Sequence, residues 1–224
     1  MRLLDVACGT GVVALTASRL GAEAQGIDLT PELINRANEN AKIMELKAKF
    51  VEGDAEFLPY RENEFDIVLS QYGHMFAPRP SIVVKELARV LKPGGILAFS
   101  TWPKELFMGK FFKLIESFSQ PLPPEVASPV LWGDMAVIED RLRDHFDQIE
   151  FARDTMFAPT MSPAHMLKLF EKNAGPLANL VKALADDPTK LSNLRNAALV
   201  LIEKFFSNNF LRQDFLMTRC VKKT

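Results

Sequence analysis

Short apolar runs and helical spacings alternate along the first hundred residues. The apolar runs predict five strands, at residues 3–6, 24–27, 48–51, 65–72 and 96–102. Segments between them carry apolar residues at helical spacing and predict helices over residues 12–20, 30–41 and 81–91. Strands that alternate with helices are typical of βαβ units, right-handed crossovers and a parallel sheet.

The residues after Trp102 follow a different pattern. Amphipathic or proline-capped segments predict further helices over residues 104–118, 134–146, 162–175, 176–185 and 187–206. Two stretches, residues 148–157 and 210–221, are expected to be strands. Two helical insertions therefore interrupt the later strands.

The composition is that of an ordinary globular protein and excludes several classes of function. Of the 224 residues, 48% are hydrophobic and 25% are charged, and the formal net charge is −1. Lysine and arginine are scattered, so neither nucleic acid nor a membrane surface is expected as a partner. The longest late apolar run, residues 197–202, is too short to span a bilayer. The two cysteines, Cys8 and Cys220, provide neither a disulfide framework nor a metal-binding spacing, which fits a cytoplasmic location.

The glycine turn after the first strand is the strongest candidate for a ligand site. Gly9, Gly11 and Ala14 fit the dinucleotide fingerprint G-x-G-x-x-G/A. Asp5, at the end of the strand, would repel a pyrophosphate and favour a ligand that carries an ammonium or sulfonium charge. The alternative is that Asp5 only braces the turn by accepting backbone hydrogen bonds. The residues of the turn leave both interpretations open.

Two more acidic residues follow the second and third strands. Asp28 follows Gly11 at close to the sequence separation at which an acidic residue reaches the ribose in nucleotide-binding folds. Its carboxylate therefore suits a ribose diol, and Leu29 could lie against an adenine face. Asp54 could accept from an adenine amino group while the Ala55 N–H donates to a ring nitrogen. Each could instead be a simple turn residue. Three acids at three successive strand ends favour a cationic or hydroxyl-rich ligand over a phosphate.

Five motifs in this order resemble a known family. Together they resemble the class I S-adenosylmethionine-dependent methyltransferases of the small-molecule, ubiquinone/menaquinone methyltransferase-like type. The resemblance covers residues 2–102 in detail. The motifs are LLDVACGTG at residues 3–11, GIDLT at 26–30, EGDAEFLPY at 52–60, FDIVLS at 65–70 and VLKPGG at 90–95.

The resemblance implies an α/β fold with a Rossmann-like, doubly wound, seven-stranded sheet whose last strand is antiparallel. It implies one domain over residues 1–224, with a cofactor-binding core at 1–102, helical cap insertions at 103–133 and 159–209, and a closing strand at 210–224. Family members usually carry a helical segment before the first strand. Either the start of this chain is truncated, or the insertions supply the cover over the cofactor.

The resemblance also implies S-adenosylmethionine as the cofactor and assigns residues to it. Many relatives have glycine where this chain has Ala7. The fourth strand would open onto the sulfonium and the substrate at Ser70, Gln71 and His74. The methionine end would be lined by Asp5, Ala7, Gly9 and Gly11, and the adenosine would be held by Asp28, Leu29, Asp54 and Ala55.

Methyl transfer is an in-line displacement at an activated carbon, so the protein mainly aligns the donor with the acceptor. A general base is needed only if the acceptor loses a proton, and His74 is the best-placed histidine for that role; the alternative is a packing role. The aromatic residues of the insertions either pack the helices together or line a pocket for an apolar or aromatic small-molecule acceptor. Two other functions remain open, an NAD-dependent oxidoreductase and a non-catalytic S-adenosylmethionine-binding protein.

Overall fold

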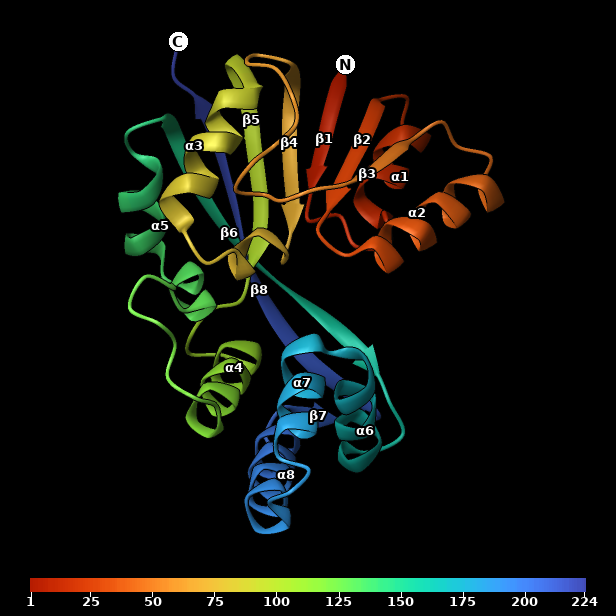
Figure 1. Ribbon diagram of the computed structural model, residues 1–224, viewed down its shortest axis with the longest axis vertical. Helices are drawn as coiled ribbons and strands as arrows, with labels where there is room; N and C mark the ends of the chain where they lie inside the picture. The colour runs from red at the N-terminus through yellow and green to blue at the C-terminus, as the bar shows by residue number, and fades with distance from the viewer. The chain divides into compact units, whose positions relative to one another are not determined.

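The strands pair in the order β3-β2-β1-β4-β5-β8-β6 in the computed structural model, which describes residues 1–224 (Figure 1). Strands β1 to β5 pair in parallel with one another, and β8 is antiparallel to β5. The predicted sheet of seven strands with an antiparallel last strand is thus confirmed, and a short extra strand pairs with β8. The strands are β1 (Arg2–Val6), β2 (Glu23–Asp28), β3 (Lys49–Glu52), β4 (Phe65–Gln71), β5 (Leu91–Thr101), β6 (Phe146–Pro159), β7 (Phe206–Ser207) and β8 (Phe210–Lys222).

Helices follow the strands as the sequence pattern predicts. Because the strand order reverses between β1 and β4, right-handed crossovers place the helices after β1 and β2 on one face and the helix after β4 on the other. Figure 1 shows α1 and α2 beside β1 to β3, and α3 close to α5 near β5. The α-helices are α1 (Val12–Arg19), α2 (Pro31–Ile43), α3 (Pro80–Val90), α4 (Phe107–Phe118), α5 (Met135–Leu142), α6 (Pro163–Asn173), α7 (Gly175–Ala183) and α8 (Pro188–Glu203).

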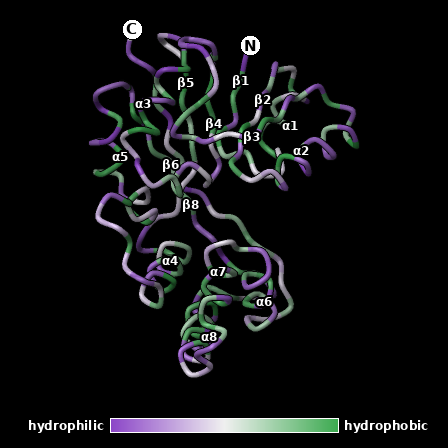
Figure 2. The backbone as a smooth tube through the Cα atoms, in the orientation of Figure 1, coloured by the Kyte–Doolittle hydropathy of each residue, from purple (hydrophilic) through white to green (hydrophobic).

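The sheet is held by apolar side chains on both faces. Leu4, Phe65, Val68 and Leu97 in the central strands are fully buried, as parallel strands covered by helices require. Hydrophobic and hydrophilic segments alternate along α2 (Figure 2), whose buried residues are Ile34, Ala37 and Ala41. This packing fixes the carboxyl ends of β1 to β4 relative to one another.

Several local features differ from the predicted elements. β5 begins at Leu91, five residues before the predicted start, and the register between β4 and β5 shifts there. α5 ends at Leu142 because the chain turns into β6 at Phe146. Two short 3-10 helices, η1 (His74–Phe76) and η2 (Pro129–Gly133), lie in connections between the predicted elements.

The chain divides into two compact units. The first comprises residues 1–101, 125–152 and 216–224, and the second comprises residues 102–124 and 153–215. The predicted insertions cover residues 103–133 and 159–209, so their bounds differ from those of the two segments of the second unit. Residues 125–133 join the first unit because Trp132 in η2 packs on His74 and Phe99 within it.

The second unit has an aromatic core of its own. Phe107 and Phe111 of α4 stack on each other with ring centroids 5.6 Å apart, and both pack against Phe170 of α6. Phe205, after α8, completes the cluster against Phe107. These residues therefore hold the helices of this unit together. None of the eight α-helices combines the length and the apolar character that a bilayer crossing requires.

Candidate functional site

The connection between β1 and α1 is a tight turn in left-handed backbone. The φ angles of Ala7, Gly9 and Gly11 are +55°, +54° and +86°. A Cβ atom at Gly11 would lie 2.6 Å from the Phe50 ring, so this position needs glycine for space as well as for conformation. Ala7 adopts the same backbone region with a side chain, and such strain is typical of functional sites.

Two carboxylates of the protein accept backbone hydrogen bonds from the turn and from the first turn of α1. Gly9 N donates to Asp28 Oδ2 at 2.8 Å, and Ala14 N donates to Asp5 Oδ2 at 3.1 Å. Thr30 N donates to the other Asp28 oxygen at 2.9 Å. A dinucleotide fold uses such N–H groups to bind a pyrophosphate. Here Gly9 N and Ala14 N bind carboxylates of the protein instead, and a phosphate beside these carboxylates would be repelled.

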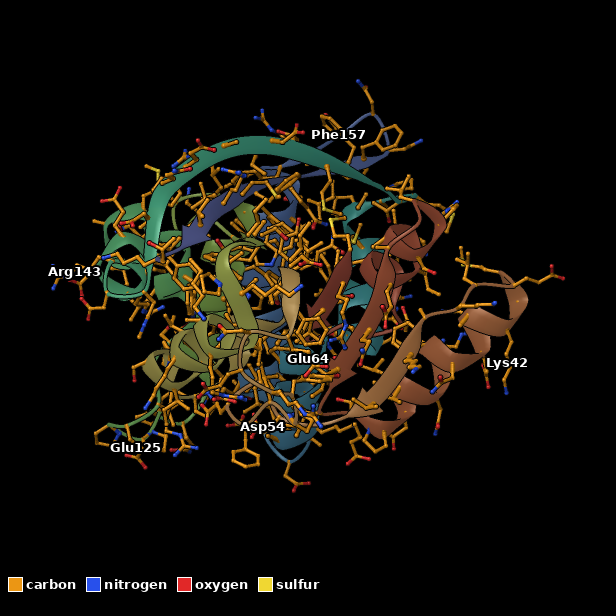
Figure 3. The ribbon with its side chains drawn as sticks, turned by 90° about the horizontal axis from the view of Figure 1, so that it is seen from above. Lys42, Asp54, Glu64, Glu125, Arg143 and Phe157 are labelled. Carbon is orange, nitrogen blue, oxygen red and sulfur yellow. The ribbon has the colours of Figure 1, made fainter.

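The turn opens onto a cleft of about 570 Å³ at the carboxyl ends of β1 to β4. This volume lies within the range of small-molecule sites. Figure 3 labels Asp54, in the loop after β3 that forms one side of the cleft. The lining consists of Ala7, Gly9, residues 28–30, Leu33, and residues 53–55, 71–73 and 76–78.

The chemistry of the lining selects against phosphate. It contains the carboxylates of Asp28 and Asp54 and no lysine, arginine or histidine. The apolar side chains of Leu29 and Phe76 are 67% and 46% exposed, so they offer surface to a flat ring. The residues present therefore fit an adenosyl ligand with a positive charge and no phosphate. No group of three or more His, Cys, Asp and Glu side chains is arranged to hold a metal ion.

The cleft brings together most of the residues that the sequence singled out. Those that line it are Ala7, Gly9, Asp28, Leu29, Asp54, Ala55 and Gln71. Four others are not part of the lining, namely Asp5, Gly11, Ser70 and His74. The cofactor-binding roles of these residues stay predictions.

Asp5 lies behind the turn, with only 1% of its surface exposed. Burial, with a smaller contribution from the nearby charge of Asp28, raises the pKa of Asp5 to about 7, although the hydrogen bond from Ala14 N opposes the shift. Its Oδ1 atom has no partner. This geometry supports the bracing role that the sequence left open beside the electrostatic one.

His74 is packed inside the first unit. Its ring lies 4.6 Å from the Phe99 ring and 4.7 Å from the Trp132 ring, and its Nδ1 atom lies 3.1 Å from Ser70 Oγ. Burial, assisted by the charge of Arg141, lowers the pKa of His74 to about 3, so the imidazole is neutral near pH 7. This geometry supports the packing role; a catalytic role for His74 stays a prediction.

The residues after β4 form a wall of the cleft that the sequence reasoning missed. Tyr72, Gly73, Phe76, Ala77 and Pro78 all line the cleft. The sequence offers only a weak signal for this wall, namely a glycine and a proline in the connection that follows a buried strand. Thr30, Leu33 and Gly53 were missed as well.

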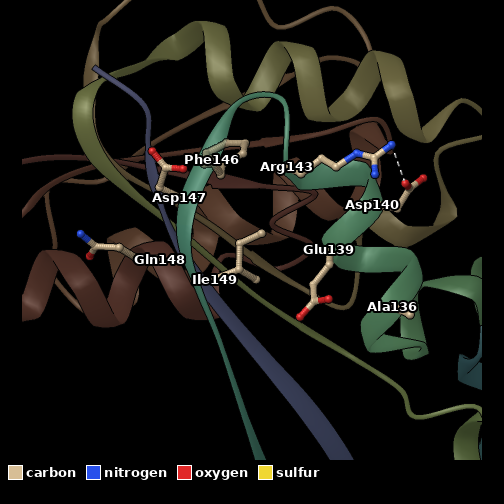
Figure 4. Close-up of a pocket in the computed structure, with 8 residues that line it drawn as sticks. All are labelled: Ala136, Glu139, Asp140, Arg143, Phe146, Asp147, Gln148 and Ile149. Carbon is tan, nitrogen blue, oxygen red and sulfur yellow. Dashed lines mark ion pairs between the residues drawn. The ribbon is translucent and has the colours of Figure 1, made fainter.

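A second hollow, of about 510 Å³, lies between α5 and the start of β6 (Figure 4). Its charged residues Glu139, Asp140, Arg143 and Asp147 are exposed, and Arg143 pairs with Asp140 at 2.9 Å. Exposed ion pairs of this kind contribute little to the free energy of folding. None of the residues that line this hollow has a buried polar atom without a hydrogen-bond partner. The cleft at the glycine turn is therefore the stronger candidate.

Comparisons with known proteins identify the family of the chain. The family model described as "Methyltransferase domain" matches residues 4–99. The uncharacterized protein Rv1403c of Mycobacterium tuberculosis is 33% identical over 217 residues, which cover 96% of this chain and 79% of that protein. The demethylmenaquinone methyltransferase of Staphylococcus aureus is 39% identical over 100 residues, which cover 43% of this chain and 41% of that protein.

A solved structure supports the fold independently. Phosphoethanolamine N-methyltransferase 2 of Haemonchus contortus, in complex with S-adenosylmethionine, superposes with a TM-score of 0.62 at 18% identity. The superposition covers 100% of this chain and 49% of that one. The strand order, the cleft at the glycine turn and the family match agree, and the chain belongs to the class I methyltransferases, the family that uses S-adenosylmethionine as its methyl donor.

Proposed function

We propose that the cleft at the glycine turn binds S-adenosylmethionine and that the protein transfers its methyl group to a small-molecule acceptor. The observation that carries the proposal is the lining of the cleft, which holds two carboxylates and no cationic side chain. A sulfonium is attracted by such a lining, whereas the two charges of a pyrophosphate are repelled by it.

Each end of the cofactor has candidate residues in the cleft. The Asp28 carboxylate, whose oxygens each accept one backbone hydrogen bond, has remaining lone pairs for the two ribose hydroxyls. Leu29 and Phe76 offer apolar surface to the adenine, and Asp54 and Ala55 offer an acceptor and a donor for its edge. Ala7, Gly9 and Gln71 are the candidate contacts for the methionine end of the cofactor.

The bound cofactor supplies a methyl group on a positively charged sulfur, which makes that carbon reactive toward a nucleophile. The chain itself holds the reactants in line and keeps the turn rigid through the carboxylates of Asp5 and Asp28. Two observations support a small-molecule acceptor. The similar Staphylococcus aureus protein is a demethylmenaquinone methyltransferase, and the net charge of −1 does not favour a nucleic-acid acceptor. Among the exposed apolar side chains in or near the predicted insertions, Phe157 and Met161, which are 60% and 74% exposed, are candidates for contact with an acceptor.

A thermal-shift comparison of two ligands tests the proposal. A ligand that binds only the folded state stabilises it by about 2.7 kcal/mol at 100 times its Kd. We expect S-adenosylhomocysteine to raise the melting temperature and NAD to leave it unchanged. The reverse result would indicate an NAD-dependent oxidoreductase. Stabilisation without turnover of any acceptor in a broad small-molecule panel would indicate a binding protein without catalysis.

The contact between Gly73 and Ala7 gives a second prediction. A Cβ atom at Gly73 would lie 2.3 Å from Ala7 Cβ and 2.7 Å from Ala7 O, and both residues line the cleft. We expect Gly73→Ala to lower the free energy of unfolding by about 1–3 kcal/mol, because overpacking forces backbone shifts. The Kd for S-adenosylhomocysteine should rise about tenfold.

The matched control is Gly175→Ala, at a site where an added Cβ meets nothing within 4 Å. Urea denaturation gives the unfolding free energies, and calorimetry gives the affinities. Equal effects of the two substitutions would show that the contact between Gly73 and Ala7 does not shape the cleft.

A further inference from the structure

Two loops line the cleft, and an ion pair joins the residues that directly follow the lining stretch of each loop. Residues 53–55 line the cleft from the loop after β3, and residues 76–78 line it from the connection between β4 and α3. Glu56 directly follows the first stretch, and Arg79 directly follows the second. The two side chains meet in a salt bridge that none of the assigned roles explains.

The pair has the geometry of a strong contact. Arg79 N donates to Glu56 Oε1 at 2.6 Å, and Arg79 Nε donates to Glu56 Oε2 at 2.7 Å. The Glu56 side chain is only 4% exposed, whereas that of Arg79 is 56% exposed. Surface ion pairs contribute little, but a buried carboxylate that loses its partner is costly. The position of the Pro78–Arg79 backbone is therefore tied to that of Glu56.

Glu56 also contacts Asp54, a residue that lines the cleft. Glu56 N donates to Asp54 Oδ1 at 2.8 Å, and Phe57 N donates to Asp54 O at 3.0 Å. Asp54 also lies near enough to Arg79 to help raise the pKa of its guanidinium. Glu56 therefore contacts both Asp54, which lines the cleft, and Arg79, which directly follows the second lining stretch.

We propose that Glu56 and Arg79 are positioning residues that fix the separation of the two loops and so set the affinity of the cleft for the adenosine end of the cofactor. The proposal rests on the proposed function, because it assumes that an adenosyl ligand binds between these loops. Neither residue lines the cleft, so they act through Asp54 and through residues 76–78. The competing view is that the pair contributes only to stability.

Calorimetric titration with S-adenosylhomocysteine, well below the melting temperature, separates the two views. We expect Glu56→Gln and Arg79→Gln each to raise the Kd about tenfold, because a widened cleft loses contacts with the ring. The double variant should bind no more weakly than the weaker single variant, because the pair acts as one unit. Arg79→Lys keeps the charge and should recover part of the affinity.

The matched control is Glu171→Gln, which breaks the bidentate pair of Glu171 with Arg195 in the second unit. A Kd that stays constant in Glu56→Gln and Arg79→Gln while the melting temperature falls would overturn the positioning role. The same loss of affinity in Glu171→Gln would overturn it as well. If the unsubstituted protein failed to bind S-adenosylhomocysteine, the proposed function itself would fail, a result distinct from equal binding by all variants.

Discussion

Replacing Asp28 with alanine is expected to raise the Kd for S-adenosylhomocysteine at least about 100-fold. The substitution removes two candidate hydrogen bonds to the ribose, and hydrogen bonds to a charged group contribute about 1.5–3 kcal/mol each. It also frees Gly9 N and Thr30 N, which Asp28 holds at 2.8 and 2.9 Å. Calorimetry measures the affinity, and circular dichroism checks that the fold persists.

Asp134→Ala provides the control for this prediction. The Asp134 carboxylate also accepts from a backbone N–H two residues further on, that of Ala136 at 3.1 Å, but it lies outside the cleft. We expect Asp134→Ala to lower the melting temperature slightly and to leave the affinity intact. Retention of tight binding by Asp28→Ala would refute the assignment of Asp28 to the ribose.

Asp5 is expected to make the protein less stable as the pH rises. Its folded-state pKa of about 7 lies above the ordinary value of 3.8, so the native state binds this proton more tightly than the unfolded state does. The stabilising contribution is complete below pH 3.8 and is lost as the pH rises through about 7. With 1.36 kcal/mol for each pKa unit, the loss is on the order of 4 kcal/mol.

Asp5→Asn should remove this pH dependence, because the amide resembles the protonated acid. Urea denaturation of both proteins at several pH values between 4 and 8 gives the difference in unfolding free energy, which should grow with pH in favour of Asp5→Asn. Asp66→Asn is the control, because the contact with Lys92 lowers the pKa of Asp66, so that this carboxylate stays charged across this pH range and its substitution should give a constant difference. A constant difference between the unsubstituted protein and Asp5→Asn would contradict the buried, raised-pKa state of Asp5.

The local parts of the site could be predicted because they depend on neighbours in sequence. The apolar run of β1, the two glycines and the helical spacing after Val12 determine the strand, the turn and the helix. Asp28 ends β2 and Asp54 follows β3, so the parallel sheet brings both acids to the same edge.

The remaining parts depend on contacts between distant segments. Whether Asp5 faces the cleft or the interior is decided by the donor Ala14 N, which the folded turn places behind the strand. The wall after β4 follows from the approach of Gly73 to Ala7, which no periodicity encodes. The bounds of the two units depend on Trp132 packing against His74, a contact between segments almost sixty residues apart.

The division of the chain has a consequence for exchanging parts between relatives. Every residue that lines the cleft comes before Arg79, and all of them belong to the first unit. The second unit is assembled from residues 102–124 and 153–215, so no single contiguous fragment contains it. Chimeras that replace both segments with those of a homologue should therefore inherit the donor affinity of this chain, and any change in acceptor preference would map to the grafted segments.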